Sequence, residues 1–371
     1  MSAASTSSNA MPLPRPKKVK AKKVTLKPSS STPPLGKFLA SSEKPVRDKA
    51  VASLARFLAG TKNAANLDGE DASEEELVVG ELDWDVEYEL DSRLAPGEMA
   101  KLWKGVFYCF WMSDKPLVQQ ALASDLALLT LSVRPKTQGG RSLGRVARFT
   151  SAMSYLRAFW DAIVREWSGL DRLRLDKFYL LIRRFVHVGF VLLKREQWDP
   201  QAISLYNELL TGPGGPLHVV DPKIPQSIAY HLSDIFIDEL EASLSRPLTS
   251  SIVLPSAPVP INHLLQPLFT TLAVGPTTTL FQRLSDNGFE PLILASIPQK
   301  EVGGRNKKRK AVEAVEEEDL PFKGILGLGA EREKVGRGVL KAMFDEGGKK
   351  ETGEVARRRI YALVAKWDVE V

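Results

Sequence analysis

The chain has 371 residues, of which 43% are hydrophobic and 26% charged, so it is long enough for one large core or two average ones. Its single cysteine excludes an internal disulfide and any metal site built from several cysteines, and favours a reducing compartment. The net charge of +6 is concentrated in residues 1–28, which hold seven basic and no acidic side chains and leave 44 basic against 45 acidic side chains elsewhere.

The first 34 residues form a basic tail, rich in serine and proline and almost without large apolar side chains. Such a composition cannot bury enough surface to offset the entropy of ordering, so we expect disorder. We expect the lysines of its PKKVKAKK run to contact RNA phosphates, and the run also resembles a nuclear-localisation signal. These lysines are Lys17, Lys18, Lys20, Lys22 and Lys23. No apolar stretch suited to a secretory signal accompanies them.

Residues 101–119, KLWKGVFYCFWMSDKPLVQ, hold a dense group of aromatic side chains. Their three- and four-residue spacing predicts a helix that ends near Met112. Ser113 is a candidate N-cap for a second helix, with Pro116 in its first turn, so the two helices would form an antiparallel hairpin. The aromatic face could stack RNA bases, but the flanking aliphatic residues favour packing in a core.

Further helices follow with the same period. Residues Ala152–Trp167 form an amphipathic stripe that Ser168–Gly169 ends, and Asp171 can cap a helix over Arg172–Arg195. That second helix is apolar on most faces, which predicts a central and largely buried position. A glycine-rich turn at 212–215 precedes the remaining predicted helices, which are Pro222–Leu244, Asn262–Leu272, Thr279–Leu284 and Pro291–Ser296.

The predicted fold class is all-α, because no segment shows convincing strand alternation. Consecutive helix pairs without a strict sequence period favour an irregular HEAT- or armadillo-like α-solenoid, and an ordinary globular helical domain is the alternative. The predicted organisation is a disordered basic tail (1–34), an α-helical domain (35–297), a charged linker (298–320) and a C-terminal helical extension (321–371). The longest strongly apolar run, 185–193, is too short to span a bilayer.

A basic stretch lies between Asp125 and Asp161, where the sequence has no acidic residue. It could neutralise several RNA phosphates, each adding salt-dependent affinity. The alternative is a solvated surface whose charge is balanced in space by acidic loops. The candidate RNA contacts of this stretch are Arg134, Lys136, Arg141, Arg145 and Arg148, with Arg157 beyond them.

Three basic side chains of the predicted central helix, Lys177, Arg184 and Arg195, share one face. They could extend the basic stretch, or they could pair with Asp176 or Glu196.

A second candidate nuclear-localisation signal lies in the charged linker, where a basic cluster precedes an acidic one. It is the KKRK run formed by Lys307, Lys308, Arg309 and Lys310. Two such runs in accessible segments favour nuclear entry.

Signals for catalysis are weak. The glycines of GILGLG at 324–329 follow a linker and not a strand, and their spacing matches neither nucleotide-binding pattern. The alternating carboxylates of ELDWDVEYEL at 81–90 lack a matching histidine, and we interpret them as a solvated or partner-binding face. We interpret His187 as a satisfied core histidine and Cys109 as an inert core thiol. We therefore predict no catalytic, cofactor-binding or metal-binding residue, no cofactor, no small-molecule substrate and no membrane contact.

Four long segments carry a family resemblance across about residues 35–245. They are KFLASSEKPVRDKAVASLARFL at 37–58, LWKGVFYCFWMSDKPLVQQ at 102–120, FWDAIVREWSGLDRLRLDKFYLLIRRF at 159–185, and LYNELL with GPLHVVDPKIPQSIAYHLSDIFIDEL within 205–240. With these segments the chain resembles the ribosomal RNA-processing protein 1 family, the nucleolar (Nop-type) factors of large-subunit ribosome assembly. Residues 135–149 look like an insertion, and residues after about 300 match only weakly.

The resemblance implies a helical-repeat scaffold that joins pre-ribosomal particles in the nucleolus and has no catalytic residues to transfer. Precursor ribosomal RNA and other assembly factors are then the expected partners. A nuclear protein–protein adaptor that never touches RNA is the alternative. A nucleotide-dependent enzyme that uses residues 324–329 is a third hypothesis, and we expect no nucleotide binding.

Overall fold

The computed structural model describes residues 38–39, 41–59, 94–135, 144–245, 258–275, 277–296 and 320–367. Every regular element within these ranges is helical and none is a strand, which confirms the all-α prediction. All of them belong to one compact unit, residues 34–371. No described helix is both long enough and apolar enough to cross a bilayer.

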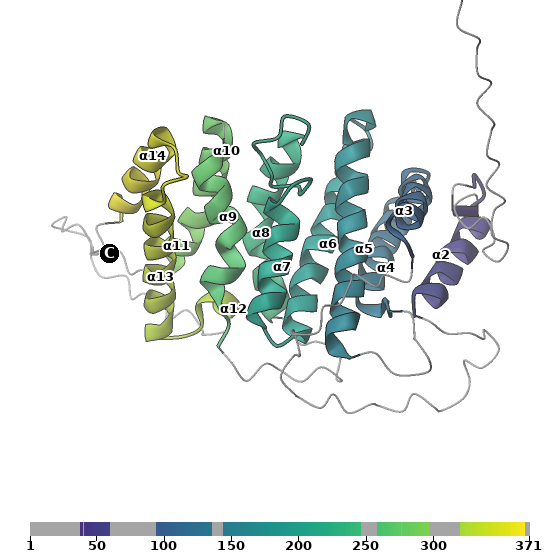
Figure 1. Ribbon diagram of the computed structural model, residues 1–371, viewed down its shortest axis with the longest axis horizontal. Helices are drawn as coiled ribbons and strands as arrows, with labels where there is room; N and C mark the ends of the chain where they lie inside the picture. Colours follow the sequence, from purple (N-terminus) through teal and green to yellow (C-terminus); the bar gives the residue numbers. More distant parts are fainter. Residues whose placement is uncertain are drawn as a thin grey trace, which may run out of the picture. The chain divides into compact units, whose positions relative to one another are not determined.

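Figure 1 shows the helices arranged broadly in chain order, from α2 at one end to α13 and α14 at the other. The N-terminal helices are α2 (Lys44–Ala59), α3 (Pro96–Trp111), α4 (Pro116–Ser132), α5 (Arg145–Glu166) with the 3₁₀ turn η1 (Trp167–Gly169), α6 (Leu175–Arg195), α7 (Pro200–Thr211) and α8 (Gln226–Ser245). The C-terminal ones are α9 (Ile261–Val274), α10 (Thr278–Arg283), the π-helix η2 (Leu284–Phe289), α11 (Glu290–Ser296), α12 (Lys323–Leu326), α13 (Ala330–Gly348) and α14 (Glu354–Ala365).

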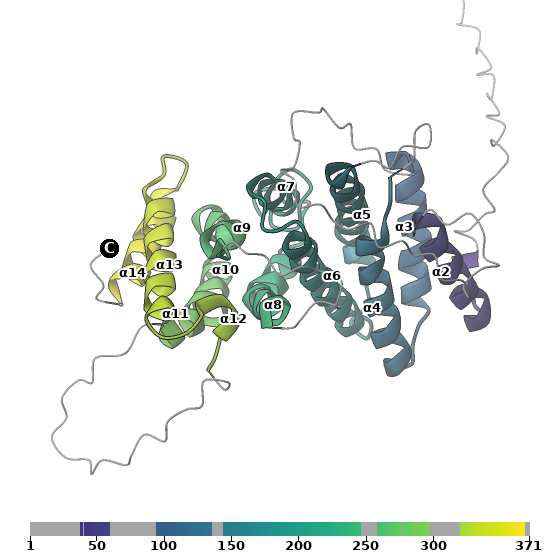
Figure 2. The ribbon, with the colours of Figure 1, turned by 90° about the horizontal axis from the view of Figure 1, so that it is seen from below.

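The helices pack in two series, each made of every second helix. In one series α2 contacts α4, α4 contacts α6, and α6 contacts α8, which also meets α10, η2 and α12. In the other series α3 contacts α5, α5 contacts α7, and α7 contacts α9. Figure 2 shows α5 and α7 on one side and α4 and α8 on the other. Contacts of α5 with α4 and α6 join the two series, so the core lies between them.

The C-terminal helices continue this core. Helix α12 contacts α8, α13 contacts α9 and α11, and α14 contacts α9 and α13. Their buried side chains Val339, Leu340, Met343 and Ile360 belong to the same hydrophobic cluster as those of the N-terminal helices. The predicted C-terminal extension therefore shares the core of the predicted α-helical domain.

The centre of the core is aromatic and joins three helices. Trp103 of α3 lies 5.4 Å from Phe159 of α5 and 5.6 Å from Phe185 of α6, measured between ring centroids. The rings of Phe159 and Phe185 stack with their centroids 3.7 Å apart. All three side chains are at most 2% exposed. The interpretation of the α3 aromatic face as core holds for Trp103, Phe107 and Phe110, whereas Tyr108 is 38% exposed.

The end of α3 and the start of α4 differ from the prediction. Helix α4 begins at Pro116 after Lys115, and no side chain caps it. Ser113, the predicted N-cap, is 2% exposed, and its hydroxyl donates to the carbonyl oxygen of Cys109 at 3.0 Å. The prediction was wrong because Ser113 still belongs to the closing turn of α3, where its hydroxyl satisfies a carbonyl.

Two other helix starts are set by aspartates. The carboxylate of Asp171 accepts from the backbone N–H groups of Leu173 and Arg174, so it caps a turn that precedes α6, which begins at Leu175. At α7 the carboxylate of Asp199 accepts from the N–H groups of the second and third helical residues, and Pro200 occupies the first position. Proline is well suited to that position because its missing N–H would have no intrahelical partner.

Candidate nucleic-acid interface

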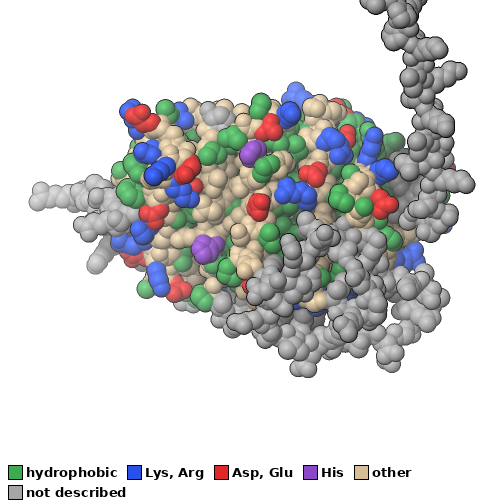
Figure 3. Space-filling view, viewed as in Figure 1, with side chains coloured by type: hydrophobic (Ala, Val, Ile, Leu, Met, Phe, Trp, Pro, Cys, Tyr) green, Lys and Arg blue, Asp and Glu red, His purple; other side chains and the backbone are tan. Residues whose placement is uncertain are grey.

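The predicted RNA contacts are only partly within the described residues. Lys17, Lys18, Lys20, Lys22, Lys23, Lys136 and Arg141 lie outside them, as do Lys307, Lys308, Arg309 and Lys310 of the candidate nuclear-localisation signal. Arg134, Arg145, Arg148 and Arg157 lie inside them. On the face shown in Figure 3, Lys and Arg side chains are interspersed with Asp and Glu and do not form a single patch.

The described arginines occupy the end of α4 and the face of α5, two helices that contact each other. Arg134 follows α4, its side chain is exposed, and its backbone N–H donates to the carbonyl oxygen of Leu58 at 2.9 Å. Arg148 is half-buried in the first turn of α5. Arg157, two turns further along α5, donates to the carbonyl oxygen of Pro213 at 3.4 Å.

Arg145 already binds an anion within the protein. Its Nε lies 2.8 Å from Oε2 of Glu196, a carboxylate that is only 2% exposed. Arg195 pairs with the other oxygen of Glu196 at 3.0 Å. A phosphate that recruited Arg145 would leave this buried carboxylate with one cation fewer, which is costly in a desolvated site. Binding of RNA by Arg145 would therefore compete with an ion pair of the protein itself.

Two of the basic side chains predicted to share a face of the central helix, Lys177 and Arg195, make contacts within the protein. Lys177 is 6% exposed, and its ammonium donates to the carbonyl oxygens of Trp111 at 2.6 Å and Ser113 at 3.0 Å. Burial lowers the pKa of Lys177. Arg195 donates to the carbonyl oxygen of Leu131 at 3.0 Å in addition to its pair with Glu196. Extension of the basic stretch by Lys177 is therefore wrong, and the alternative pairing of Arg195 with Glu196 is correct.

The glycine-rich segment at 324–329 binds a carboxylate of the protein. The backbone N–H groups of Gly324 and Ile325 donate to the two oxygens of Glu241 on α8, each at 2.8 Å. Gly324 also approaches α8 so closely that an added Cβ would lie 2.8 Å from Cβ of Leu244. A phosphate at these N–H groups would have to displace the Glu241 carboxylate, which argues against a nucleotide site here.

The remaining candidates for chemistry have structural contacts. His187 is half-buried, with its Nδ1 3.1 Å from Oε2 of Glu239. Cys109 is 1% exposed, and burial raises the pKa of its thiol to about 11, so little thiolate forms near neutral pH. In the described ranges no group of three or more His, Cys, Asp or Glu side chains is arranged to hold a metal ion.

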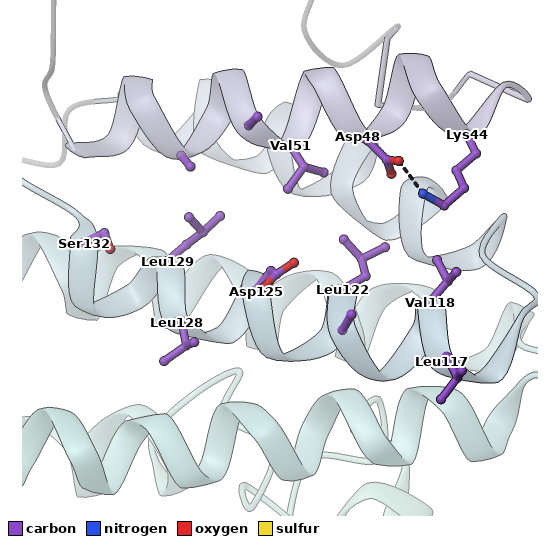
Figure 4. A pocket seen from close by; sticks show the side chains of 13 residues that line it. Lys44, Asp48, Val51, Leu117, Val118, Leu122, Asp125, Leu128, Leu129 and Ser132 are labelled. Carbon is purple, nitrogen blue, oxygen red and sulfur yellow. Dashed lines mark hydrogen bonds and ion pairs between the residues drawn. The ribbon is translucent and has the colours of Figure 1, made fainter. Parts of the chain in front are cut away.

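The sequence prediction missed a groove between α2 and α4, with a volume of about 620 Å³ (Figure 4). Its wall on α4 includes Leu117 and Leu128, which are 80% and 52% exposed. Leu126 and Leu129 of the same helix are instead buried in the core. The available signal was the position of Leu117 directly after Pro116, in the first turn of α4.

Comparison with known proteins finds one family model over most of the chain and several relatives. The Nop52 family model, described as a nucleolar protein, matches residues 30–323. The chain is 29% identical over 274 residues to ribosomal RNA processing protein 1 homolog B of Mus musculus, covering 73% of this chain and 31% of that protein. It is 33% identical over 204 residues to the Homo sapiens homolog B, covering 54% of this chain and 21% of that protein.

The Homo sapiens homolog A is 31% identical over 219 residues, covering 58% of this chain and 38% of that protein. The chain thus spans well under half the length of these curated relatives. The family model, in contrast, matches most of the chain and includes every helix from α2 to α11. This chain belongs to the Nop52 family of nucleolar proteins.

Proposed function

We propose that this chain is a non-catalytic nucleolar assembly factor in ribosomal RNA processing and large-subunit biogenesis, which holds protein and precursor ribosomal RNA together within a preribosome. The observation that carries the proposal is the Nop52 match over residues 30–323, together with relatives that are named ribosomal RNA processing protein 1. The contacts at residues 324–329 and at Cys109 support a structural role and not a catalytic one for these groups.

The packing of every second helix supports the proposal that the body is an irregular α-solenoid. In such folds each helical hairpin buries the face of its neighbours, and the two helices of a hairpin line opposite surfaces. The contact series α2–α4–α6–α8 and α3–α5–α7–α9 have this form. A body of this kind offers an extended rigid surface on which several partners can bind at once.

RNA contact would come from the basic tail and from the basic stretch after α4. Lys17, Lys18, Lys20, Lys22 and Lys23 supply a dense run of cations. Arg134 and Arg148, together with Lys136 and Arg141, supply further phosphate contacts beside the body. Phosphate contacts of this type position a protein on RNA without reading its sequence.

The salt dependence of RNA binding tests this part of the proposal. We expect deletion of residues 1–28 to weaken binding to precursor ribosomal RNA and to flatten the plot of log affinity against log salt. Removing one phosphate-binding cation should change the slope by about 0.7 on single-stranded RNA. A variant with the five tail lysines changed to serine should reproduce the change at unaltered chain length. An unchanged slope in both variants would contradict RNA contact by the tail.

A nuclear protein–protein adaptor without RNA contact is the second candidate. It is favoured by the use of Lys177, Arg145 and Arg195 inside the protein, which removes cations from the surface of the body. Crosslinking to RNA in cells, mapped to residues, separates the two candidates. Crosslinks in the tail or between residues 134 and 157 support the scaffold on RNA, and their absence in a particle that still co-purifies supports the adaptor.

Nuclear and nucleolar localisation is tested separately from RNA binding. We expect the full chain fused to a fluorescent protein to enter the nucleolus. Changing Lys307, Lys308, Arg309 and Lys310 to serine, combined with the tail variant, should shift it to the cytoplasm. Unchanged nuclear entry of the combined variant would exclude both runs as its signals.

A further inference from the structure

The groove between α2 and α4 is an apolar surface that the proposed RNA contacts do not use. Helices α2 and α4 run in the same direction, because the carbonyl oxygen of Leu58 at the end of α2 accepts from the N–H of Arg134 after α4. The main helix contact of α2 is with α4. The groove follows both helices from Lys44 to Ala55 and from Leu117 to Ser132.

Small side chains make the groove deep enough to receive another element. Ala52 and Ala55 on α2 and Ala121 on α4 line it, so the two helix backbones are separated by little side-chain volume there. Figure 4 shows Val51 and Leu122 pointing into the space between the helices. Leu117 and Leu128 extend the apolar surface across the outer side of α4. Exposed leucines next to a groove are typical of binding sites.

One charge in the groove has no partner in the described part of the chain. Asp48 pairs with Lys44 at the entrance. Asp125 is exposed in the middle of the α4 wall, between Leu122 and Leu129, and the structure gives it neither an ion pair nor a hydrogen bond within the described residues. Figure 4 places its carboxylate on the side of α4 that faces α2. An occupant that buried this wall would need a cation opposite Asp125, because an unpaired buried carboxylate is costly.

We propose that this groove binds an amphipathic helix of a partner protein, with a lysine or arginine within its apolar stripe that pairs with Asp125. A groove between two helices with apolar anchors on both walls is the geometry of helix-in-groove recognition. The wall from Val118 to Ser132 is about 21 Å long, which suits roughly 14 residues of helix. The segment 60–93 of this chain is a poor occupant, because its 12 acidic and two basic side chains repeat the charge of Asp125.

Binding of two designed peptides to the full chain tests the proposal. Both are 18-residue helices with the same stripe of leucines, and one carries lysine and the other glutamate at the central position. We expect the lysine peptide to bind about tenfold more tightly than the glutamate peptide, as measured by fluorescence anisotropy. This difference is at the low end of the coupling energies measured for close charge pairs in interfaces. D125K should reverse the preference, and D125N should abolish it.

A variant that fills the groove can be compared with a matched control variant. Ala121 is exposed and lines the groove, whereas Ala100 is an exposed alanine on α3 outside it. We expect A121W to weaken the lysine peptide at least tenfold and A100W to leave its affinity unchanged, with both variants retaining the melting temperature of the parent. Peptide affinity that is equal in A121W and A100W would overturn the proposal.

Two further outcomes would identify a different occupant and so also overturn the proposal. If replacing residues 60–93 by a glycine–serine linker of equal length tightens peptide binding, the chain's own segment occupies the groove. If the full chain is a dimer by light scattering and A121W makes it a monomer, a second copy is the occupant. None of these measurements depends on RNA, so failure here leaves the proposed function untouched.

Discussion

The buried ammonium of Lys177 donates to the carbonyl oxygen of Trp111, with 2.6 Å between Nζ and the oxygen. Trp111 ends α3, and Lys177 lies in the first turn of α6. The last carbonyl groups of a helix have no intrahelical donors, and the helix dipole favours a positive charge beside them. Lys177 of the central helix α6 therefore provides the missing donor at the end of α3.

The same arrangement recurs elsewhere in the described part of the chain. In each case a lysine or arginine of one helix donates to a carbonyl oxygen at the end of another. The pairs are Arg195 with Leu131 at 3.0 Å, Lys194 with Ser243 at 3.0 Å, Arg332 with Ala295 at 3.0 Å, and Arg357 with Gly347 at 2.9 Å. These cations stabilise helix ends, so counting basic residues overstates the positive surface that the body offers to RNA.

Replacing Lys177 by methionine tests the importance of this contact. The change keeps the approximate length of the side chain but removes the donor to the carbonyl oxygen of Trp111, whereas the carbonyl oxygen of Ser113 still accepts from Gln119 at 2.9 Å. We expect K177M to lower the free energy of unfolding by about 2 kcal/mol, the cost of an unsatisfied buried acceptor. Urea denaturation measures the change, and K115M at an exposed position is the control. Equal stability of the two variants would show that water replaces the ammonium.

Gly189 of α6 should resist a change that helix propensity favours. A Cβ at this position would lie 2.4 Å from Oη of Tyr206, whose side chain on α7 is only 2% exposed. Alanine gains about 1 kcal/mol of helix propensity, but overpacking costs about 1–3 kcal/mol. We expect G189A to be less stable than the parent by chemical denaturation. G97A, where nothing lies within 4 Å, should be as stable as the parent or more so. A stabilised G189A would mean that α6 and α7 separate easily.

The helices could be predicted where the apolar period was long, as in α6 and α8, whereas α5 begins at Arg145, seven residues before the predicted stripe and within the supposed insertion. The predicted elements omit α7, although Asp199 and Pro200 are a strong start signal, because its apolar stripe is short. Ser113 misled the prediction because a serine before a helix is a good cap only if its backbone has left the previous helix. Local sequence does not specify that geometry.

The roles of the basic residues were less predictable than the helices. Arg145 and Glu196 are far apart in sequence and meet only because α5 packs beside the end of α6. Whether an arginine forms an internal ion pair or can contact a phosphate depends on such contacts between distant parts of the sequence. The spacing of residues along one helix does not predict them. The α2–α4 groove is similar, because the exposed Leu128 lies in sequence between the buried Leu126 and Leu129.

The carboxylate of Glu241 should hold α12 in place. It accepts from the N–H groups of Gly324 and Ile325, and partial exposure limits the strength of the two hydrogen bonds. We expect E241A to lower stability by about 1–2 kcal/mol and to speed amide hydrogen exchange at these two residues. E208Q, at an exposed position of α7, is the control. Unchanged exchange at Gly324 and Ile325 would contradict this role for Glu241.

Cys109 should be unreactive in the folded protein. The thiol is 1% exposed, and its pKa is raised to about 11, mainly by burial. A thiol with so high a pKa has roughly a hundredth of the thiolate of an exposed cysteine near neutral pH. We expect no reaction with a disulfide reagent in native buffer and one equivalent in denaturant. An S53C variant, at an exposed position of α2, should react once without denaturant. Rapid labelling of Cys109 in the native parent would indicate that α3 opens readily.

The acid sensitivity of the fold should depend on Glu239. Its carboxylate is 5% exposed, pairs with Arg183, and lies 3.1 Å from Nδ1 of His187. Burial alone would raise the pKa of Glu239, but the hydrogen bonds and charges of His187 and Arg183 outweigh it and lower the pKa below its ordinary value of 4.5. A group whose pKa is lowered on folding stabilises the protein above its unfolded value, and this stability is lost as the pH falls through the folded value.

Replacing this carboxylate by an amide should therefore flatten the acid side of the stability profile. We expect E239Q to lose about 2 kcal/mol at neutral pH, a value reduced from that of a fully buried pair because Arg183 is 41% exposed. The difference from the parent should shrink as the pH falls below about 4.5, where the carboxylate of the unfolded parent is protonated. Urea midpoints measured from about pH 3 to pH 7 give the profile. The control is E351Q, at an exposed carboxylate, whose stability should follow that of the parent at every pH. An E239Q profile parallel to that of the parent would show that this buried pair does not determine how stability falls in acid.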